Sequence, residues 1–161
     1  MWLRPGEVSP PMTLSEAAEA RPIEVLLVED DEGDVLITRE ALAEGKVVSR
    51  LHVVGDGVEA VAYLRRKKPH VDATRPDLIL LDLNLPKRDG HQVLADIKSD
   101  ADLRRIPVVV LSTSSAAEDI IRSYDLHANA YVTKPVDFDR FVRVVKQIDE
   151  FFISVVRLPP R

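Results

Sequence analysis

The sequence predicts an α/β domain with a doubly wound, five-stranded parallel sheet and five helices. Short apolar runs alternate five times with segments of amphipathic, helical spacing, and the connections between them are short. This alternation is typical of parallel sheets that helices cover on both faces. At 161 residues the chain allows one domain with a substantial core. Ligands of such domains bind beyond the carboxyl ends of the strands.

The elements can be assigned in order along the chain. The apolar run "IEVLLV" (23–28) predicts the first strand, and the amphipathic segment 33–45 predicts a helix that stops at Gly45. The further strands are expected at 50–54, 77–81, 106–112 and 130–133. The further helices are expected at 57–67, 91–99, 115–126 and 137–156.

The chain ends differ from its middle. Residues 1–22 carry four of the eleven prolines and no strand pattern, so we expect a mobile leader over 1–21. The folded domain is expected over 22–154, followed by a tail over 155–161. No room follows the last helix for a DNA-binding or enzymatic domain, so any output would be a protein contact or a relay.

Composition excludes several classes of function. The net charge is −5 without a long basic stripe, which argues against a nucleic-acid surface. The chain has no cysteine, so it has neither disulfides nor thiolate metal sites. The apolar runs are too short to span a bilayer, and the first residues lack the long apolar stretch that is typical of a signal peptide. We therefore expect a soluble, cytoplasmic protein that binds neither nucleic acid nor membrane.

Polar residues follow the predicted strands at one edge of the sheet. Glu29 and Asp30 follow the first strand, Asp82 follows the third, Ser112 closes the fourth and Lys134 follows the fifth. Carboxylates gathered in this way repel one another, and a divalent cation together with a lysine would relieve the repulsion. Oxygen ligands without His or Cys favour magnesium or manganese over zinc.

Each of these residues also has a simpler interpretation. An Asp after a strand is most often a helix cap or a turn residue, and Asp30 and Asp31 could both cap the first helix. Five such coincidences at one sheet edge would be needed to explain the whole set, so we favour a functional site. A second motif, Gly55, Gly57 and Ala60 before a helix, resembles a dinucleotide fingerprint. It does not open the sheet, and we reject it.

The motifs resemble those of the receiver domains of two-component response regulators. The similarity runs from about Ile23 to Phe152 and rests on five stretches: "VLLVEDD", "DGVEAV", "DLILLDLNLPKRDG", "VVVLSTSS" and "AYVTKP". The resemblance implies a receiver (flavodoxin-like) architecture. It implies that Asp82 accepts a phosphoryl group, that Lys134 assists, and that Ser112 and Tyr131 are the switch residues.

The resemblance also implies a cofactor and a partner. Mg²⁺, or alternatively Mn²⁺, would be held by Asp30, Asp82 and the backbone carbonyl of Asn84, with Glu29 acting through water. The phosphoryl donor would be a histidine kinase, and the chain would catalyse its own phosphorylation and dephosphorylation without being an enzyme for another substrate. The Lys134–Pro135 peptide bond is expected to be cis.

Two rival functions use similar residues. Phosphatases of the haloacid dehalogenase class carry a second Asp two residues after the nucleophile, where this chain has Asn84. A degenerate receiver that acts only as a binding module would lack the acceptor, the acids or the lysine, and all are present here.

Three stretches resemble a narrower branch of the family, the single-domain regulators paired with phytochrome histidine kinases. They are "VEDDEGD", "HANAYVTKPVDF" and "IDEFFISVVRLPPR". This resemblance implies a phytochrome photoreceptor as the kinase and red light as the input.

The last predicted helix carries many apolar residues. One stripe is expected to face the sheet, and Val144, Phe151 and Val155 widen it beyond what one packing face needs. An apolar excess of this kind is typical of interfaces. We therefore expect a homodimer through this helix and the tail. The stripe facing the sheet comprises Phe138, Phe141, Val142, Val145, Ile148, Phe152 and Val156.

Overall fold

Five parallel strands form one sheet in a computed structural model that describes residues 21–45 and 48–155, with side chains to residue 152. The strand order is β2-β1-β3-β4-β5, so the order reverses between β1 and β3. The predicted doubly wound parallel sheet is confirmed. The strands are β1 (Ile23–Val28), β2 (Ser49–Val54), β3 (Leu78–Leu81), β4 (Val108–Ser112) and β5 (Ala130–Thr133).

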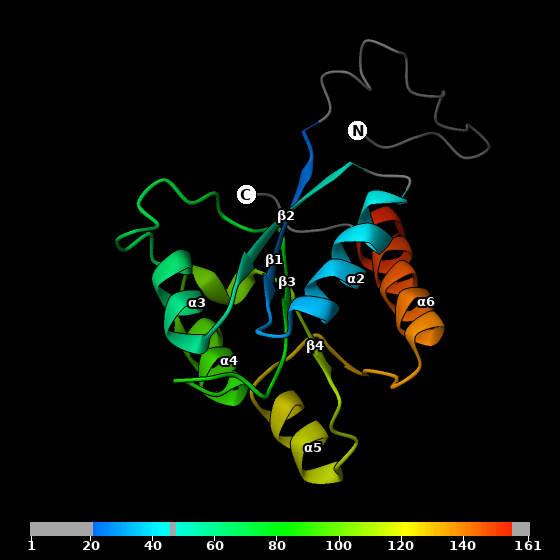
Figure 1. Cartoon of the computed structure of the whole chain (residues 1–161). Helices are drawn as coiled ribbons and strands as arrows, with labels where there is room; N and C mark the ends of the chain where they lie inside the picture. Colours follow the sequence, from blue (N-terminus) through cyan, green and yellow to red (C-terminus); the bar gives the residue numbers. More distant parts are fainter. Residues whose placement is uncertain (1–20, 46–47, 156–161) are drawn as a thin grey trace, which may run out of the picture.

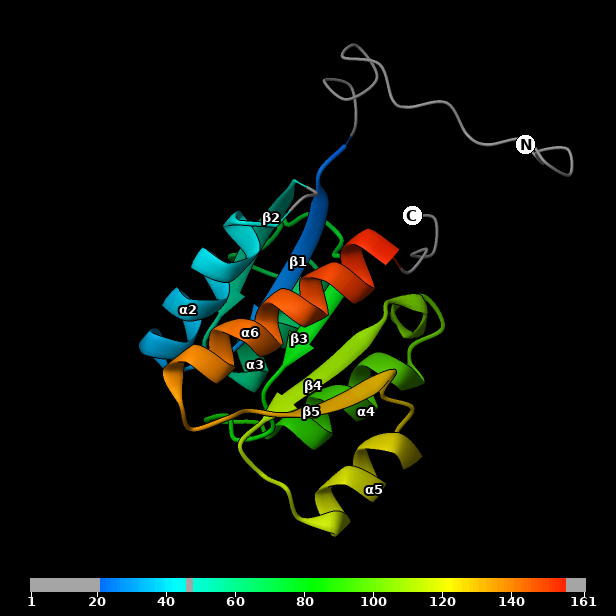
Figure 2. The ribbon, with the colours of Figure 1, turned by 90° about the vertical axis from the view of Figure 1, so that its right-hand side faces the viewer.

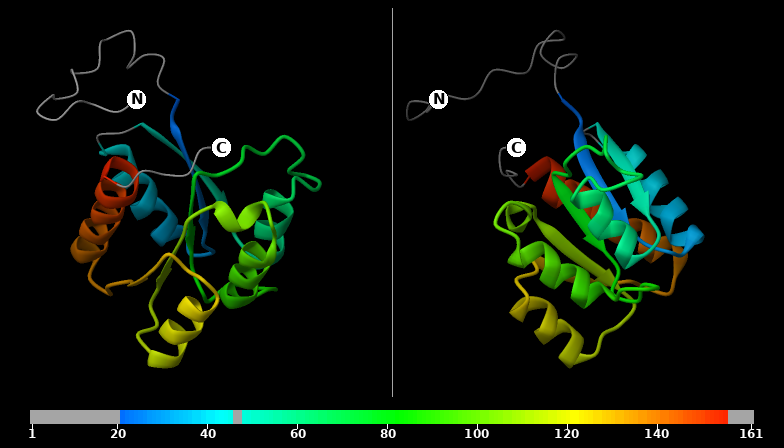
Figure 3. Two further views of the ribbon diagram at one scale, coloured as in Figure 1. Left: turned by 180° about the vertical axis from the view of Figure 1, so that it is seen from behind. Right: turned by 90° about the vertical axis from the view of Figure 1, so that its left-hand side faces the viewer.

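Helices cover both faces of the sheet (Figure 1). The first layer holds α2 (Glu32–Ala43) and α6 (Phe138–Ile148), which pack side by side against one face (Figure 2). The other face carries three helices in a row, seen most clearly in the right-hand view of Figure 3. They are α3 (Gly57–Leu64), α4 (Gly90–Ser99) and α5 (Ala117–Asp125), with the short 3₁₀ turn η1 (Leu103–Arg105) after α4.

The strands alternate their side chains between two apolar cores. On β1, Val25 and Leu27 face the core under α2 and α6, whereas Leu26 and Val28 face the core under α3 and α4. All four residues of β3 are fully buried because this strand lies in the middle of the sheet. Burial on both faces explains why the strands read as continuous apolar runs in the sequence.

Aspartates cap the helices that follow the strands. The Asp31 Oδ1 accepts a hydrogen bond from the Asp34 backbone N–H at 2.8 Å, and Asp56, Asp89 and Asp137 cap α3, α4 and α6 in the same way. A capping side chain satisfies one of the free N–H groups of the first turn. The simpler interpretation is therefore correct for Asp31.

The last helix departs from its prediction. The α-helix stops at Ile148 and continues as a π-helical segment, η2 (Asp149–Val155). Phe138, which was expected to face the sheet, is 59% exposed, because α6 starts beyond the strand ends and its first turn projects past the sheet (Figure 2). Val144 packs partly against the core, whereas Phe151 is 55% exposed. The side chains of Val155 and Val156 lie outside the described residues.

Three further expectations concern the backbone and the chain ends. The Lys134–Pro135 peptide bond is trans, so the prediction of a cis bond is wrong; among the described residues only Lys68–Pro69 is cis. In residues 21–45 and 48–155 no helix is long and apolar enough to cross a bilayer. The predicted leader, apart from Arg21, and most of the tail lie outside the described residues.

Candidate functional site

The candidate site lies at the carboxyl edge of the sheet, where the strand order reverses between β1 and β3. An open hollow of about 610 Å³ there is lined by residues from the ends of β1, β3, β4 and β5 and from the first turn of α2. A reversal point of this kind leaves a crevice because the two neighbouring connections run to opposite faces of the sheet. The lining residues include Glu29, Asp30, Asp34, Asp82, Asn84, Thr113 and Lys134.

Three carboxylates gather in this hollow. Glu29, Asp30 and Asp82 each offer an oxygen within 4.8 Å of the others, with Glu29 and Asp82 buried and Asp30 exposed. Burial raises the pKa of Glu29 to about 7, the Asp82 charge adds to the rise, and Lys134 opposes it. An all-oxygen donor set of this kind suits Mg²⁺ or Mn²⁺. The residues therefore fit the divalent cation that the sequence predicts.

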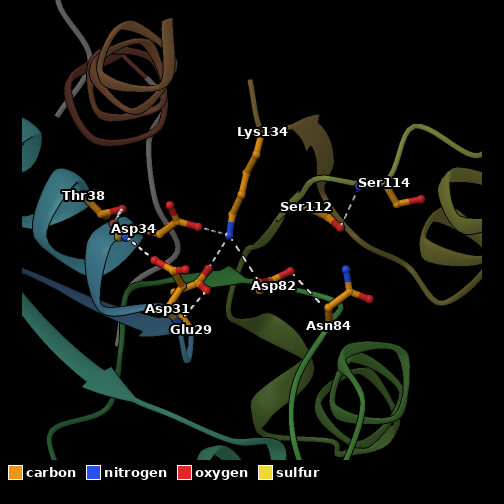
Figure 4. A network of polar contacts seen from close by, with 9 residues as sticks. All are labelled: Glu29, Asp31, Asp34, Thr38, Asp82, Asn84, Ser112, Ser114 and Lys134. Atoms are coloured by element: carbon orange, nitrogen blue, oxygen red, sulfur yellow. Dashed lines mark hydrogen bonds and ion pairs between the residues drawn. The ribbon is translucent and has the colours of Figure 1, made fainter. Parts of the chain in front are cut away.

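Lys134 reaches into the hollow from the end of β5. Its buried ammonium group donates hydrogen bonds to Glu29, to Asp34 Oδ2 at 2.9 Å and to Asp82 Oδ2 at 3.2 Å (Figure 4). Burial alone would lower the pKa of Lys134, but the hydrogen bonds to Glu29 and Asp34 outweigh it, so the pKa lies above its usual value. The backbone places the side chain here, because the Lys134 N–H extends the β5 ladder to the Ser112 carbonyl at 2.6 Å. The trans peptide bond that follows is compatible with this inward direction.

Asp82 is fixed by the loop that follows β3. Its backbone N–H donates to the Val28 carbonyl, and its Oδ1 accepts from the Asn84 N–H at 3.2 Å. The loop returns close to Asp82, since the Gly90 N–H donates to the Leu83 carbonyl at 2.9 Å. A Cβ at Gly90 would overlap the Asp82 carbonyl oxygen, so this packing requires glycine. Asn84 thus lies beside Asp82, and its carbonyl stays a predicted metal ligand.

Ser112 and Tyr131 lie on neighbouring strands beside the carboxylates. The Ser112 Oγ is buried and accepts a hydrogen bond from the Ser114 N–H at 3.2 Å. The half-buried Tyr131 donates its hydroxyl to the Ser114 carbonyl at 2.7 Å. One short segment after β4 therefore contacts both of the predicted switch residues.

Sequence reasoning missed Asp34. This residue sits in the first turn of α2 and shares Lys134 with Glu29 and Asp82, 100 positions before its partner in the chain. The only signal available was its spacing of three residues from Asp31, which places both at the start of the helix that follows β1. That spacing cannot reveal a lysine that β5 delivers.

The comparisons with known proteins agree with this geometry. Residues 25–146 match the sequence profile of the response regulator receiver domain. The chain belongs to this family. Response regulator Rcp1 of Synechocystis is 44% identical over 138 residues, which cover 86% of this chain and 94% of Rcp1.

Solved receiver structures show the same architecture. The phosphorylated cyanobacterial phytochrome response regulator RcpA is 51% identical, with a TM-score of 0.85, and the match covers 87% of this chain and all of RcpA. The Mn²⁺-bound form of Rcp1 is 44% identical, with a TM-score of 0.84 and a match over 86% of this chain and all of Rcp1. The chain is therefore a response regulator, a signalling protein built on a phosphoacceptor receiver domain, and its acidic cluster fits the divalent cation of this family.

Proposed function

We propose that this response regulator receives a phosphoryl group from a histidine kinase on Asp82. The observation that carries the proposal is the position of the Asp82 carboxylate, which is buried at a strand end, 3.2 Å from the Lys134 ammonium and beside Glu29 and Asp30. A carboxylate in this position is held in a fixed orientation, and the neighbouring Lys134 ammonium group can stabilise the negative charge of a transferred phosphoryl group.

Each side chain has a defined task in the transfer. An Asp82 oxygen attacks phosphorus in line, the P–N bond of the kinase phosphohistidine breaks, and the new P–O bond leaves an aspartyl phosphate. Lys134 and the Ser112 hydroxyl donate hydrogen bonds to phosphoryl oxygens. A divalent cation held by Asp30, Asp82 and the Asn84 carbonyl, with Glu29 acting through water, would neutralise charge on the phosphoryl oxygens. The domain catalyses this reaction and the later hydrolysis on itself.

The switch follows from the segment after β4. When the Ser112 hydroxyl turns toward a phosphoryl oxygen, it gives up its bond to the Ser114 N–H, and residues 113–115 shift with it. Tyr131 is tied to the same segment through the Ser114 carbonyl, so its ring moves as well. The phosphorylation state thereby reaches the surface around α5 and β5.

Replacement of the acceptor tests the proposal. Asp82→Asn keeps the side-chain shape but removes the nucleophile, so it should gain no phosphoryl mass after incubation with Mg²⁺ and a phosphorylated kinase or acetyl phosphate. Intact-mass spectrometry measures the uptake. The matched control is Asp72→Asn, an exposed loop residue, which should be labelled like the wild type. Chelation of the metal should abolish labelling of the wild type, and label on Asp82→Asn would refute the assignment.

The proposed kinase is a phytochrome photoreceptor, and the proposed compartment is the cytoplasm. The support is the similarity to RcpA, a cyanobacterial phytochrome response regulator, and to Rcp1 over nearly their whole lengths. Phosphotransfer profiling against the histidine kinases of the same genome, under red and far-red light, tests this partner. If the kinase that transfers the phosphoryl group fastest showed no dependence of its rate on light, the proposed partner would be wrong.

The remaining assignments concern the domain limits and assembly. The proposed receiver spans 22–154, with a leader over 1–21 and a tail over 155–161, and it signals by protein contact or relay. A chain truncated to 22–154 should still accept the phosphoryl group. We also propose that the chain forms a homodimer through α6 and the residues after it. The support is the exposed Phe151 ring, which packs edge-on against Phe152 with the ring centroids 5.1 Å apart.

A further inference from the structure

Lys134 has a third carboxylate partner, Asp34, which is not one of the three clustered carboxylates Glu29, Asp30 and Asp82. We infer that this partner, Asp34, is a positioning residue that holds one N–H of Lys134 in the unphosphorylated protein and must release it when Asp82 is phosphorylated. Asp34 then restrains phosphoryl uptake and sets how readily the domain switches. This inference rests on the proposed role of Asp82 as phosphoacceptor.

The hydrogen-bond capacity of the lysine carries the first step. An ammonium group has three N–H donors and no acceptor. In Lys134 these donors meet Glu29, Asp34 at 2.9 Å and Asp82 at 3.2 Å (Figure 4). No donor remains for a phosphoryl oxygen, so a new bond to the phosphoryl group must replace one of the three.

The exposure of the partners indicates which bond is exchanged. The Glu29 and Asp82 side chains are 3% and 9% exposed, whereas Asp34 is 27% exposed. Water can therefore solvate a released Asp34 carboxylate at lower cost than a released Glu29. The Asp82 bond is kept when the phosphoryl group is on Oδ1, because Oδ2, which accepts from Lys134, stays available as an acceptor. The Asp34 backbone stays in place throughout, because its N–H is capped by Asp31 and its carbonyl accepts from the Thr38 hydroxyl at 2.8 Å. Only the side chain has to turn.

The charge of the site works in the same direction. Six acidic residues line the hollow with a single lysine, and Asp34 is the one of them that pairs with Lys134 from the first turn of α2. An incoming anionic phosphoryl group is repelled by each ionised carboxylate that remains. Replacement of Asp34 by a neutral residue removes one of these charges and weakens the competitor for the Lys134 N–H. No proton is transferred in this exchange, since only the acceptor of one hydrogen bond changes.

Beryllofluoride, a phosphoryl mimic, gives an equilibrium test. At saturating Mg²⁺, Asp34→Asn should bind beryllofluoride about tenfold more tightly than the wild type, the scale expected when a charged hydrogen-bond competitor is removed. Its uptake of phosphoryl from acetyl phosphate should accelerate by a similar factor. Asp34→Glu restores the charge and should return both values toward the wild type. Tyrosine fluorescence titration and intact-mass kinetics measure the two quantities.

Matched variants separate this inference from the proposed function. Glu40→Gln removes an exposed acid from the same helix, outside the lining of the hollow, and should behave as the wild type. Equal affinities for Asp34→Asn and Glu40→Gln, or weaker binding by Asp34→Asn, would overturn the role of Asp34. Asp34→Ala provides a second neutral variant with the same expectation. If the folded wild type bound no beryllofluoride and accepted no phosphoryl group, the proposed function itself would fail.

Discussion

At the scale of single residues, Asp149 is a buried carboxyl group that lies outside the candidate site. Asp149 begins η2 against the end of α2, where a Cβ on Gly45 would overlap its Oδ2. Its Oδ1 has no hydrogen-bond partner among the described residues. Burial raises the pKa of Asp149, and the Glu150 charge adds to the rise. The ionised form of this residue therefore costs stability.

The pH dependence of this cost has a definite sign. An acid whose pKa is raised by folding favours the folded state below its unfolded pKa, here 3.8, and loses that contribution as the pH rises through the folded pKa. Asp149→Asn should raise the Tm by about 2–4 °C at about pH 7, and the gain should vanish near pH 3. Thermal melts across this range measure it, with the exposed Asp139→Asn as control. A Tm gain that does not vary with pH would contradict the assignment.

At the scale of elements, α4 and the loop before it fix the position of Asp82. Gly90, the first residue of α4, packs against the Asp82 carbonyl. A Cβ added at Gly90 would lie only 2.5 Å from the Leu83 Cα. Gly90→Ala should destabilise the domain by about 1–3 kcal/mol, since backbone atoms must move, and should slow phosphoryl uptake. Denaturant unfolding and labelling kinetics measure both effects. Gly55→Ala, whose Cβ meets nothing within 4 Å, should change neither by a comparable amount.

The elements also show how far sequence reasoning reaches. The strand positions were predictable because each apolar run is bounded by polar residues. The predicted strands 23–28 and 130–133 have the same bounds as β1 and β5. Helix ends were less predictable, since α6 stops at Ile148 and passes into η2 where apolar spacing continues. The gathering of Glu29, Asp82 and Lys134 followed from parallel topology. The contact of Asp34 with Lys134 did not, because it depends on how a side chain of α2 turns toward β5.

At the scale of the whole molecule, α2 connects the site with a distant surface. Its first turn supplies Asp34 to Lys134, and its length packs against α6 on the same face of the sheet (Figures 1 and 2). Near its end, Glu44 pairs with Lys146 of α6. Release of Asp34 on phosphorylation would therefore act on a helix that contacts α6 directly. This arrangement would give the proposed phosphoryl group a route to α6, in addition to the proposed route through Tyr131 to α5 and β5.

The proposed dimer can be tested on the whole molecule by measuring its mass in solution. Phe151 exposes its ring just after α6, and a two-fold interface would bury each ring against the partner copy. Phe151→Glu combined with Val155→Glu should give a folded, phosphorylatable monomer, because a charged group in an apolar interface loses its hydration. Ile121→Glu, a control at an exposed apolar residue on α5, should leave the dimer intact. Light scattering at tens of micromolar, with and without beryllofluoride, measures the mass, and a monomeric wild type under both conditions would refute the interface.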